Sequence, residues 1–311
     1  MMGSMMRRSF AMSLIAAGVA RRVPQGSRAD IILNATRDKQ TEPCPRGYGG
    51  GKIDLRGGFG EKQAGKLYNT EEPLFNFTVL VTGYEPFSTF DFNPAQEVAR
   101  LLNGTCSTVY LTAPFTFVLC YDGVALPVSS LGSSWAALAL EKEPTRWDAV
   151  VHLGFESSAR GLRLETIAAN VEASEEYHHM RNSDVPCSKE GTPFRYIQEG
   201  ASCILPTTAP LSYLTLDDLT MLLESSGYRD VAAQKTWSRD AGTYFCNEQY
   251  FRTLYSVREA AEPGASLIPV MFVHLPHHDI MDLDDMAVMV NFIAESLVLG
   301  TIGLLFDPRT A

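Results

Sequence analysis

The stretch FNFTVLVTGYEPF, residues 75–87, decides the fold, because it is the first segment with the pattern of a buried strand. Phe77, Val79 and Val81 recur at every second position, which is the period of a β-strand, and Gly83 ends the run. We therefore expect a compact domain to begin here, on a strand whose end carries a Gly-Tyr-Glu-Pro-Phe turn.

Helices and strands alternate after this first strand. NPAQEVARLLNG, residues 93–104, predicts a helix, because a proline stands in its first turn and a glycine follows its end. The other predicted helices are 133–143, 215–227 and 283–300, and the other β-rich runs are 107–115, 123–129, 147–155, 162–171, 230–237 and 266–276. A polar, proline-containing excursion covers 172–212. This alternation predicts an α/β protein: a three-layer α/β/α sandwich with a mostly parallel central sheet.

The first 74 residues differ from the rest. They include a Gly-rich, charged stretch without apolar periodicity, so we expect a flexible N-terminal arm at 1–74 and a catalytic domain at 75–311. Residues 1–29 hold five arginines and no acidic residue, around an apolar run too short to span a bilayer. That pattern is typical of a mitochondrial presequence. A disordered tail, a start codon assigned too early and a secretory signal are the alternatives. The last is favoured by glycosylation sequons at Asn34, Asn76 and Asn103.

Charge and cysteine content limit the function classes. The formal net charge of −10 offers no electrostatic footprint for nucleic acid or an anionic membrane, so we expect neither as a partner. The six cysteines form no CxxC pair and no regular spacing, which argues against a zinc site and against a disulfide framework. Reduced thiols fit a cytosol or a mitochondrial matrix. We expect a cytoplasmic location, with mitochondria as the alternative.

Cys246 stands directly after a tight turn and two aromatic residues, in SRDAGTYFCNEQYF at 238–251. Gly242 permits the turn, and a helix starting there aims its first backbone N–H groups at the sulfur. Such groups favour the thiolate form of a cysteine. A small buried core residue is the alternative interpretation, because free cysteines are among the most buried residue types.

Two further ionisable residues accompany this cysteine. His274 ends the apolar strand of 266–276, and Glu165 lies in the otherwise apolar 162–171, where a buried carboxylate needs a partner. Together they suggest a Cys-His-Glu triad, while a structural histidine and an ion pair of the glutamate with a nearby arginine stay open. His277, His278 and Asp279 follow closely, and we interpret them as a polar loop rather than a metal site.

Two motifs resemble pyroglutamyl peptidase I, also called pyrrolidone-carboxylate peptidase. Its leading TGF-x-PF turn with a following Asn-Pro is matched by residues 82–87 and 93–94, and its AG-x-[YF]-x-C segment by 241–246. LRLETIAANV is similar to the segment with the family's glutamate, and MFVHLP to that with its histidine. The resemblance runs in order from about residue 77 to the closing helix, and this chain is most like the divergent eukaryotic members.

The resemblance implies a cysteine exopeptidase that removes N-terminal pyroglutamate from peptides. Cys246 becomes the nucleophile, His274 the general base and then acid, and Glu165 the partner that orients the histidine. The implied reaction needs no metal or organic cofactor. Pyroglutamate has a neutral lactam, so we expect an aromatic pocket for its ring, with Tyr84, Phe87, Phe155, Tyr244 and Phe245 as the candidate substrate-binding residues.

This chain departs from the family pattern at three places. Tyr84 stands where phenylalanine is usual, Ser88 and Thr89 where two glycines follow the first turn, and Glu175 where bacterial members carry an arginine. An oxyanion role for that arginine is therefore not carried over. The alternatives are a related cysteine amidase with an altered pocket, or a non-catalytic binder of N-terminally blocked peptides. The oligomeric state is left open.

Overall fold

The computed structural model describes residues 75–87, 90–110, 116–173, 194–214, 216–225, 227–228 and 236–305. The predicted arm at 1–74 therefore lies outside the described residues, as do Ser88, Thr89, Glu175 and the sequon at Asn34. The elements in chain order are β1 Phe75–Tyr84, α2 Pro94–Leu102, β2 Cys106–Tyr110, β3 Thr116–Leu126, α3 Ser130–Lys142, β4 Ala149–Phe155, β5 Arg163–Ala169, β6 Glu172–Ala173, β7 Phe194–Arg195, β8 Ile204–Pro206, η4 Leu211–Tyr213, α4 Leu216–Ser225, β9 Trp237–Asp240, α6 Phe245–Glu259, β10 Val270–Leu275 and α7 Leu283–Leu305.

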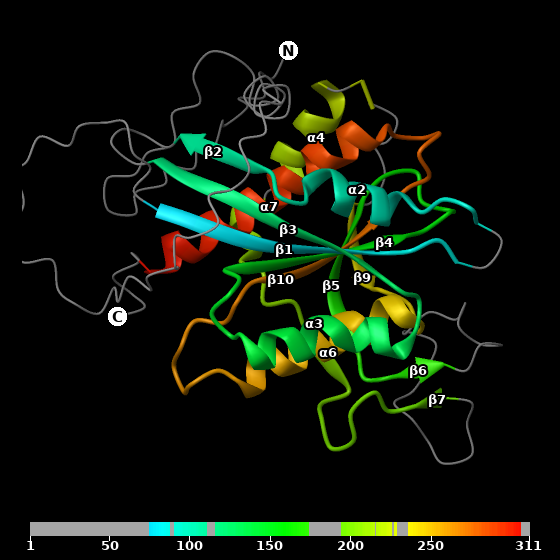
Figure 1. The fold of residues 1–311 in the computed structure, drawn as a ribbon, viewed down its shortest axis with the longest axis vertical. Helices are drawn as coiled ribbons and strands as arrows, with labels where there is room; N and C mark the ends of the chain where they lie inside the picture. Colours follow the sequence, from blue (N-terminus) through cyan, green and yellow to red (C-terminus); the bar gives the residue numbers. More distant parts are fainter. Residues whose placement is uncertain are drawn as a thin grey trace, which may run out of the picture.

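A single eight-stranded sheet crosses the domain, in the order β2-β3-β1-β4-β10-β5-β8, with β9 pairing alongside β5 (Figure 1). The strands β3, β1, β4 and β10 run parallel, and β9 is parallel to β5. Antiparallel pairs occur at β2–β3, β10–β5 and β5–β8. The predicted α/β fold with a mostly parallel sheet is confirmed. The reversal at β5 was not predicted, and it matters for the active site.

Helices cover both faces of the sheet, which makes three layers. In Figure 1, α2, α4 and α7 lie on one side of the strands and α3 and α6 on the other. Two hydrophobic clusters fill the spaces between sheet and helices. Alternate residues of β10 divide between them: Met271 and Val273 belong to the cluster under α7, whereas Val270 and Phe272 belong to the one under α6. By the same period His274 points toward α6.

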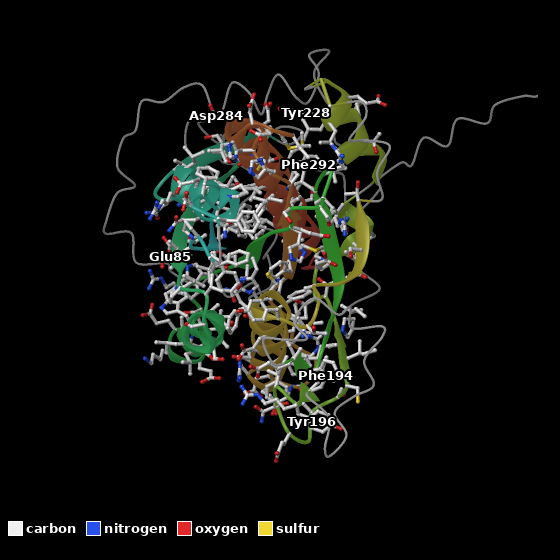
Figure 2. The ribbon with its side chains drawn as sticks, turned by 90° about the vertical axis from the view of Figure 1, so that its right-hand side faces the viewer. Glu85, Phe194, Tyr196, Tyr228, Asp284 and Phe292 are labelled. Carbon is white, nitrogen blue, oxygen red and sulfur yellow. A yellow bond between two sulfur atoms is a disulfide. The ribbon has the colours of Figure 1, made fainter. Side chains whose placement is uncertain are left out.

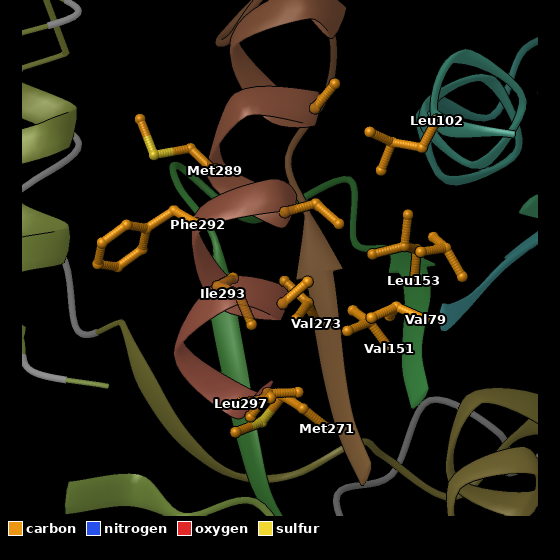
Figure 3. Close-up of a cluster of buried hydrophobic side chains, with 14 of the residues drawn as sticks. Val79, Leu102, Val151, Leu153, Met271, Val273, Met289, Phe292, Ile293 and Leu297 are labelled. Carbon is orange, nitrogen blue, oxygen red and sulfur yellow. The ribbon is translucent and has the colours of Figure 1, made fainter. Parts of the chain in front are cut away.

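Helix α7 is the most apolar helix of the described residues. Its segment Leu283–Gly303 is long and apolar enough to cross a membrane, but 78% of the tested window is buried inside the protein. Figure 3 shows Ile293 and Leu297 of this helix lying against Val273 and Met271 of β10. Its apolar character is therefore that of a core helix.

Helix α2 begins at Pro94, ten residues after the end of β1, and its cap holds the turn that follows the strand. Asn93 is its N-cap, and the Asn93 side chain accepts a hydrogen bond from the N–H of Ala95 at 2.9 Å. The Nδ2 group of Asn93 donates to the carbonyl of Glu85 at 3.2 Å. The Asn-Pro pair therefore ties the helix start to the turn that follows β1.

The excursion of 172–212 holds short elements of regular structure. β6 and β7 form a small antiparallel pair, closed by a two-point ion pair between Arg195 and Glu172 at 2.8 and 2.9 Å. Figure 2 shows Phe194 and Tyr196 at one end of the molecule and Tyr228 and Asp284 at the other. The β6–β7 pair lies on the α6 side of the sheet (Figure 1), and β8 extends the sheet edge.

Strand boundaries differ from the predictions at two places. β3 starts at Thr116, seven residues before the predicted run at 123–129, and so includes the apolar stretch FVLCY at 117–121 that the prediction left out. The strand predicted at 230–237 overlaps β9, Trp237–Asp240, only at Trp237. Its sequence Trp-Ser-Arg-Asp is too short and too polar to give a clear strand pattern. Residues 230–235 lie outside the described part of the chain.

The prediction that the cysteines form no disulfides is wrong. Cys106 and Cys120, opposite each other on the antiparallel strands β2 and β3, form a disulfide with a Cα–Cα distance of 4.1 Å. Cys203 is disulfide-bonded as well. Sequence spacing does not reveal such a cross-strand pair, because its proximity comes from strand register. Cys246 is a free thiol.

Candidate active site

A tight turn presents Cys246 in the first turn of α6. Gly242 has φ of +86°, a left-handed conformation that glycine adopts without strain, and the helix then begins at Phe245. The first intrahelical hydrogen bond runs from the N–H of Glu248 to the carbonyl of Tyr244 at 3.0 Å. The N–H groups of Phe245 and Cys246 precede that bond and point out of the helix start. The predicted placement of this cysteine at a helix N-terminus is confirmed.

His274 and Glu165 meet on neighbouring strands beneath the cysteine. In the antiparallel pair of β10 and β5, Glu165 is opposite Phe272, so it is the diagonal neighbour of His274 on the same face. His274 Nδ1 and Glu165 Oε1 lie 2.8 Å apart, and both side chains are buried. Because β5 runs backwards, Glu165 comes from the start of its strand while His274 comes from the end of β10.

The histidine is held in its charged form by its two neighbours. Burial lowers the pKa of His274, but hydrogen bonds to Cys246 and to Glu165, with their negative charges, raise it in total to about 10. The ring edge of His274 packs against Gly154, where an added Cβ would come within 2.8 Å of the ring. The structure thus brings Cys246, His274 and Glu165 together, as the sequence predicted.

Tyr84 lies beneath the start of α6 instead of lining an open surface. Its side chain is buried, and its hydroxyl donates to the carbonyl of Phe245 at 2.9 Å and pairs with the hydroxyl of Ser133 at 2.8 Å. Burial raises the pKa of Tyr84 well above the ordinary value, and the nearby Cys246 raises it further. The hydroxyl that distinguishes this residue from phenylalanine therefore holds the residue that precedes the nucleophile.

Aromatic rings gather at the carboxyl ends of β1 and β4. The half-buried Phe87 contacts Phe90 with ring centroids 5.9 Å apart, and Phe90 meets Phe155 edge-to-face at 5.1 Å. Tyr244 and Phe245 form a second pair at 4.1 Å. The predicted pocket residues Phe87 and Phe155 are thus joined through Phe90. Sequence reasoning missed Phe90, although its place three residues after Phe87 was a usable signal.

Two residues of α6 lock the nucleophile helix onto β5. Asn247 exchanges hydrogen bonds with the backbone N–H and carbonyl of Ala169, both at 2.9 Å, and also donates to the carbonyl of Val171. Tyr250 donates its hydroxyl to the backbone carbonyl of Glu165 at 2.9 Å. These residues position Cys246 and Glu165 without belonging to the predicted triad. Periodicity did not distinguish them from ordinary helix residues.

A polar chain runs through the core behind the triad. His152 of β4 contacts Thr82 through Nδ1 at 2.8 Å and Thr253 through Nε2 at 3.0 Å, and Gln249 donates to Thr82 at 3.0 Å. Burial lowers the pKa of His152 to about 3, so it is neutral. The chain links β1, β4 and α6. A histidine within the apolar run at 147–155 was its only sequence signal.

The polar loop after β10 brings three possible metal ligands together. Ligand atoms of His277, His278 and Asp279 lie within 4.8 Å of one another, with His277 Nδ1 at 3.2 Å from Asp279 Oδ2. The His277 ring also lies 5.9 Å from that of Phe155. The site proposed for catalysis uses none of these three side chains.

Comparisons with known proteins agree with this geometry. The family model of pyroglutamyl peptidases matches residues 77–300. The pyrrolidone-carboxylate peptidase of Halalkalibacterium halodurans is 27% identical over 230 residues, covering 70% of this chain and 98% of that protein. Its counterpart in Clavibacter michiganensis is 28% identical over 204 residues, covering 64% and 78%.

Solved structures share the fold. The pyrrolidone carboxyl peptidase of Thermococcus litoralis aligns with a TM-score of 0.51 at 21% identity, covering 71% of this chain and 93% of that one. The pyroglutamyl peptidase I of Bacillus amyloliquefaciens aligns with a TM-score of 0.50 at 18% identity, covering 72% and 96%. The family match spans most of the domain, including Cys246, His274 and Glu165. The chain belongs to the pyroglutamyl peptidase family.

Proposed function

We propose that this protein is a cysteine exopeptidase that removes N-terminal pyroglutamate from peptides. The observation that carries the proposal is the half-buried Cys246 beside the buried His274–Glu165 pair, within a chain of this family. A thiol beside a positively charged imidazole exists largely as thiolate, which is the nucleophilic form. The carboxylate behind the imidazole stabilises that positive charge and fixes the ring orientation.

In the first half of the reaction, the Cys246 sulfur attacks the carbonyl carbon of the pyroglutamyl residue. The N–H groups at the start of α6 stabilise the oxyanion that forms, because they are already oriented and belong to the positive end of the helix. His274 gives a proton from Nε2 to the leaving amine as the C–N bond breaks. A thioester and a shortened peptide result.

In the second half, water hydrolyses the thioester. His274 has lost its proton, so it accepts one from the attacking water, and the same N–H groups hold the second oxyanion. Loss of the thiolate then releases free pyroglutamate. Glu165 contacts the histidine through Oε1 and orients the ring for both proton transfers.

The aromatic residues near the site supply the recognition of the lactam. Phe87 and Phe155, joined by Phe90, offer apolar surface for the ring, and Tyr244 and Phe245 flank the nucleophile. Tyr84 acts on the substrate only through the backbone of Phe245. Selection of pyroglutamate over proline then comes from hydrogen bonds to the lactam carbonyl, whose loss costs about 1–3 kcal/mol.

The test is hydrolysis of a pyroglutamyl fluorophore by the full chain, compared with prolyl, glutaminyl and free-amine substrates. We expect cleavage of the first alone, and a loss of at least about 10³-fold in kcat for Cys246→Ala. Glu165→Gln should reduce kcat less, because the nucleophile stays in place. Equal rates on prolyl and pyroglutamyl substrates would point to a different amidase. Full activity of Cys246→Ala would refute the mechanism.

A further inference from the structure

The cysteines of the described chain divide into oxidised ones and the nucleophile. Cys106 and Cys120 join β2 to β3, and Cys203 is disulfide-bonded, whereas Cys246 is a free thiol. Disulfides form and persist in oxidising compartments and are rare where the glutathione pool keeps thiols reduced. The cytoplasmic location expected from reduced thiols therefore loses its basis.

A glycosylation sequon lies directly beside the first disulfide. Asn103-Gly104-Thr105 immediately precedes Cys106. Asn103 is the exposed C-cap residue of α2, and Gly104 has φ of +71°, so the chain turns sharply at the sequon and leaves the helix end in solvent.

The contacts of Asn103 are compatible with a glycan. Its Oδ1 accepts a hydrogen bond from the N–H of Gly123 at 3.0 Å. An N-linked sugar is attached through Nδ2 and leaves Oδ1 in place, so this hydrogen bond survives the modification. The turn is also anchored to β3 by its backbone, because Gly104 N–H donates to the carbonyl of Tyr121 at 2.9 Å.

The glycan would also be distant from the proposed chemistry. Helix α2 starts at Pro94, near the turn after β1, and its nine residues carry the chain about 14 Å away before Asn103. A second exposed sequon begins at Asn76, but that residue lies within β1, opposite Val118 of β3 in the parallel ladder. Asn103 is therefore the better acceptor.

We propose that this chain passes through an oxidising, glycosylating compartment and carries an N-linked glycan on Asn103. In the transfer, Nδ2 of Asn103 forms a bond to the anomeric carbon of an oligosaccharide carried on a lipid diphosphate. The bond from that carbon to the diphosphate breaks, the diphosphate leaves with the electron pair, and the amide loses a proton. Each disulfide forms by exchange with an oxidised dithiol carrier, which takes up two electrons and two protons.

The test uses the full chain produced in insect cells. Digestion with peptide-N-glycosidase should increase gel mobility and convert residue 103 to aspartate, as read by mass spectrometry. Thr105→Ala should abolish the modification at residue 103, while the matched Thr105→Ser keeps both the hydroxyl and the sequon and should retain it. The Thr105 hydroxyl donates to the Leu102 carbonyl at 2.6 Å, so Thr105→Ser, which keeps a hydroxyl there, is the control that separates glycosylation from folding.

Alkylation of the denatured protein with and without reductant gives an independent reading. Without reductant, we expect Cys106, Cys120 and Cys203 to be protected and Cys246 to be labelled. The proposal is overturned if residue 103 is unmodified in the wild-type chain or stays modified in Thr105→Ala. It is also overturned if all six cysteines are labelled without reductant.

Discussion

At the scale of single residues, the site depends on an imidazole that keeps its proton. The pKa of His274 is raised to about 10 by Cys246 and Glu165 against the opposing effect of burial. In the pH range between the ordinary value of 6.5 and about 10, the folded histidine stays charged where the unfolded one is neutral. This interaction stabilises the fold fully below pH 6.5, and the stabilisation is lost as the pH rises toward 10.

The first prediction concerns the thiol paired with that imidazole. With iodoacetamide near pH 6, Cys246 should react faster than any other free thiol in the native protein, and activity should fall in proportion. His274→Ala should slow the alkylation severalfold, because the positive partner of the thiolate is gone. Peptide mapping by mass spectrometry locates the label. Uniform labelling of cysteines, or activity retained with Cys246 blocked, would show that Cys246 is a packing residue and not the nucleophile.

The second prediction concerns Phe87, which is half-buried and contacts Phe90. Phe87→Ala should raise KM for a pyroglutamyl substrate at least about tenfold, which corresponds to about 1.4 kcal/mol of lost apolar contact. The melting temperature should change little, because the ring is not part of either large core cluster. A variant with normal kinetics and a sharply lowered melting temperature would show that Phe87 is a core residue and does not bind the substrate.

At the scale of elements, the position of α6 decides whether the triad forms. The helix is fixed at its start by the Gly242 turn and the hydroxyl of Tyr84, and along its length by Asn247 and Tyr250. Each of these contacts acts on the backbone around Cys246 or Glu165. A small displacement of the helix start therefore changes the chemistry more than it changes the fold.

The third prediction separates these two effects with a matched pair of glycines. Gly242 and Gly264 have φ of +86° and +83°, and an added Cβ at either meets nothing within 4 Å. Gly242→Ala and Gly264→Ala should each destabilise the fold by about 1–2 kcal/mol through backbone strain alone. Only the former should also lower kcat, by about tenfold or more, since Gly264 lies beyond the far end of α6. Thermal melts and steady-state kinetics check both. Equal kcat losses would contradict the prediction.

The sequence predicted the helices and the apolar strands of this domain well, and its failures have physical reasons. Helical patterns with start or end signals identified α2, α4 and α7, the Gly242 turn indicated the start of α6, and the apolar runs identified β4 and β10. The short, polar β9 gave no such pattern, and the reversed direction of β5 depends on contacts between distant segments. The Cys106–Cys120 disulfide was missed for the same reason, since strand register creates it.

The candidate site was predictable to a similar extent. Cys246, His274 and Glu165 were found because each interrupts a local pattern or matches a family motif. Tyr84 was expected against the substrate, but its hydroxyl bonds the Phe245 carbonyl, a contact that no sequence period encodes. His152 and Asn247 were missed, because buried polar residues that pair across elements look like ordinary positions of a strand or helix.

At the scale of the whole molecule, a buried neutral histidine makes the fold sensitive to acid. His152 bridges Thr82 and Thr253, and burial lowers its pKa to about 3, whereas in the unfolded chain it takes up a proton near pH 6.5. The unfolded state thus binds the extra proton between these values, so stability decreases as the pH falls from 6.5 toward 3.

The fourth prediction follows from this linkage. As the pH falls from 6.5 to 3, the free energy of unfolding of the wild-type protein should decrease. The decrease should exceed that of His152→Gln by up to about 1.4 kcal/mol per pH unit. The amide of glutamine can still bond both threonines without titrating. Urea titrations at successive pH values measure the difference between the two proteins. Parallel pH profiles would show that His152 is protonated in the fold.

The fifth prediction concerns the extent of the domain. The family match begins at residue 77 and β1 at Phe75, so a chain starting at Glu72 should fold and cleave pyroglutamyl substrates at close to the full rate. Circular dichroism and the fluorogenic assay test this directly. An insoluble or inactive product would show that residues 1–71 contribute to the core.

The antiparallel pairing of β5 with β10 also sets the order of events when the chain folds. Glu165 and His274 are 109 positions apart in the sequence, and the excursion, α4, β9 and α6 lie in the chain between β5 and β10. Contacts at such separations form slowly, because closing a long loop costs chain entropy before the contact stabilises the fold. Local helices form much earlier. Recovery of cleavage during refolding would therefore mark the completion of the sheet, and a nascent chain stays inactive until its final strand has been added.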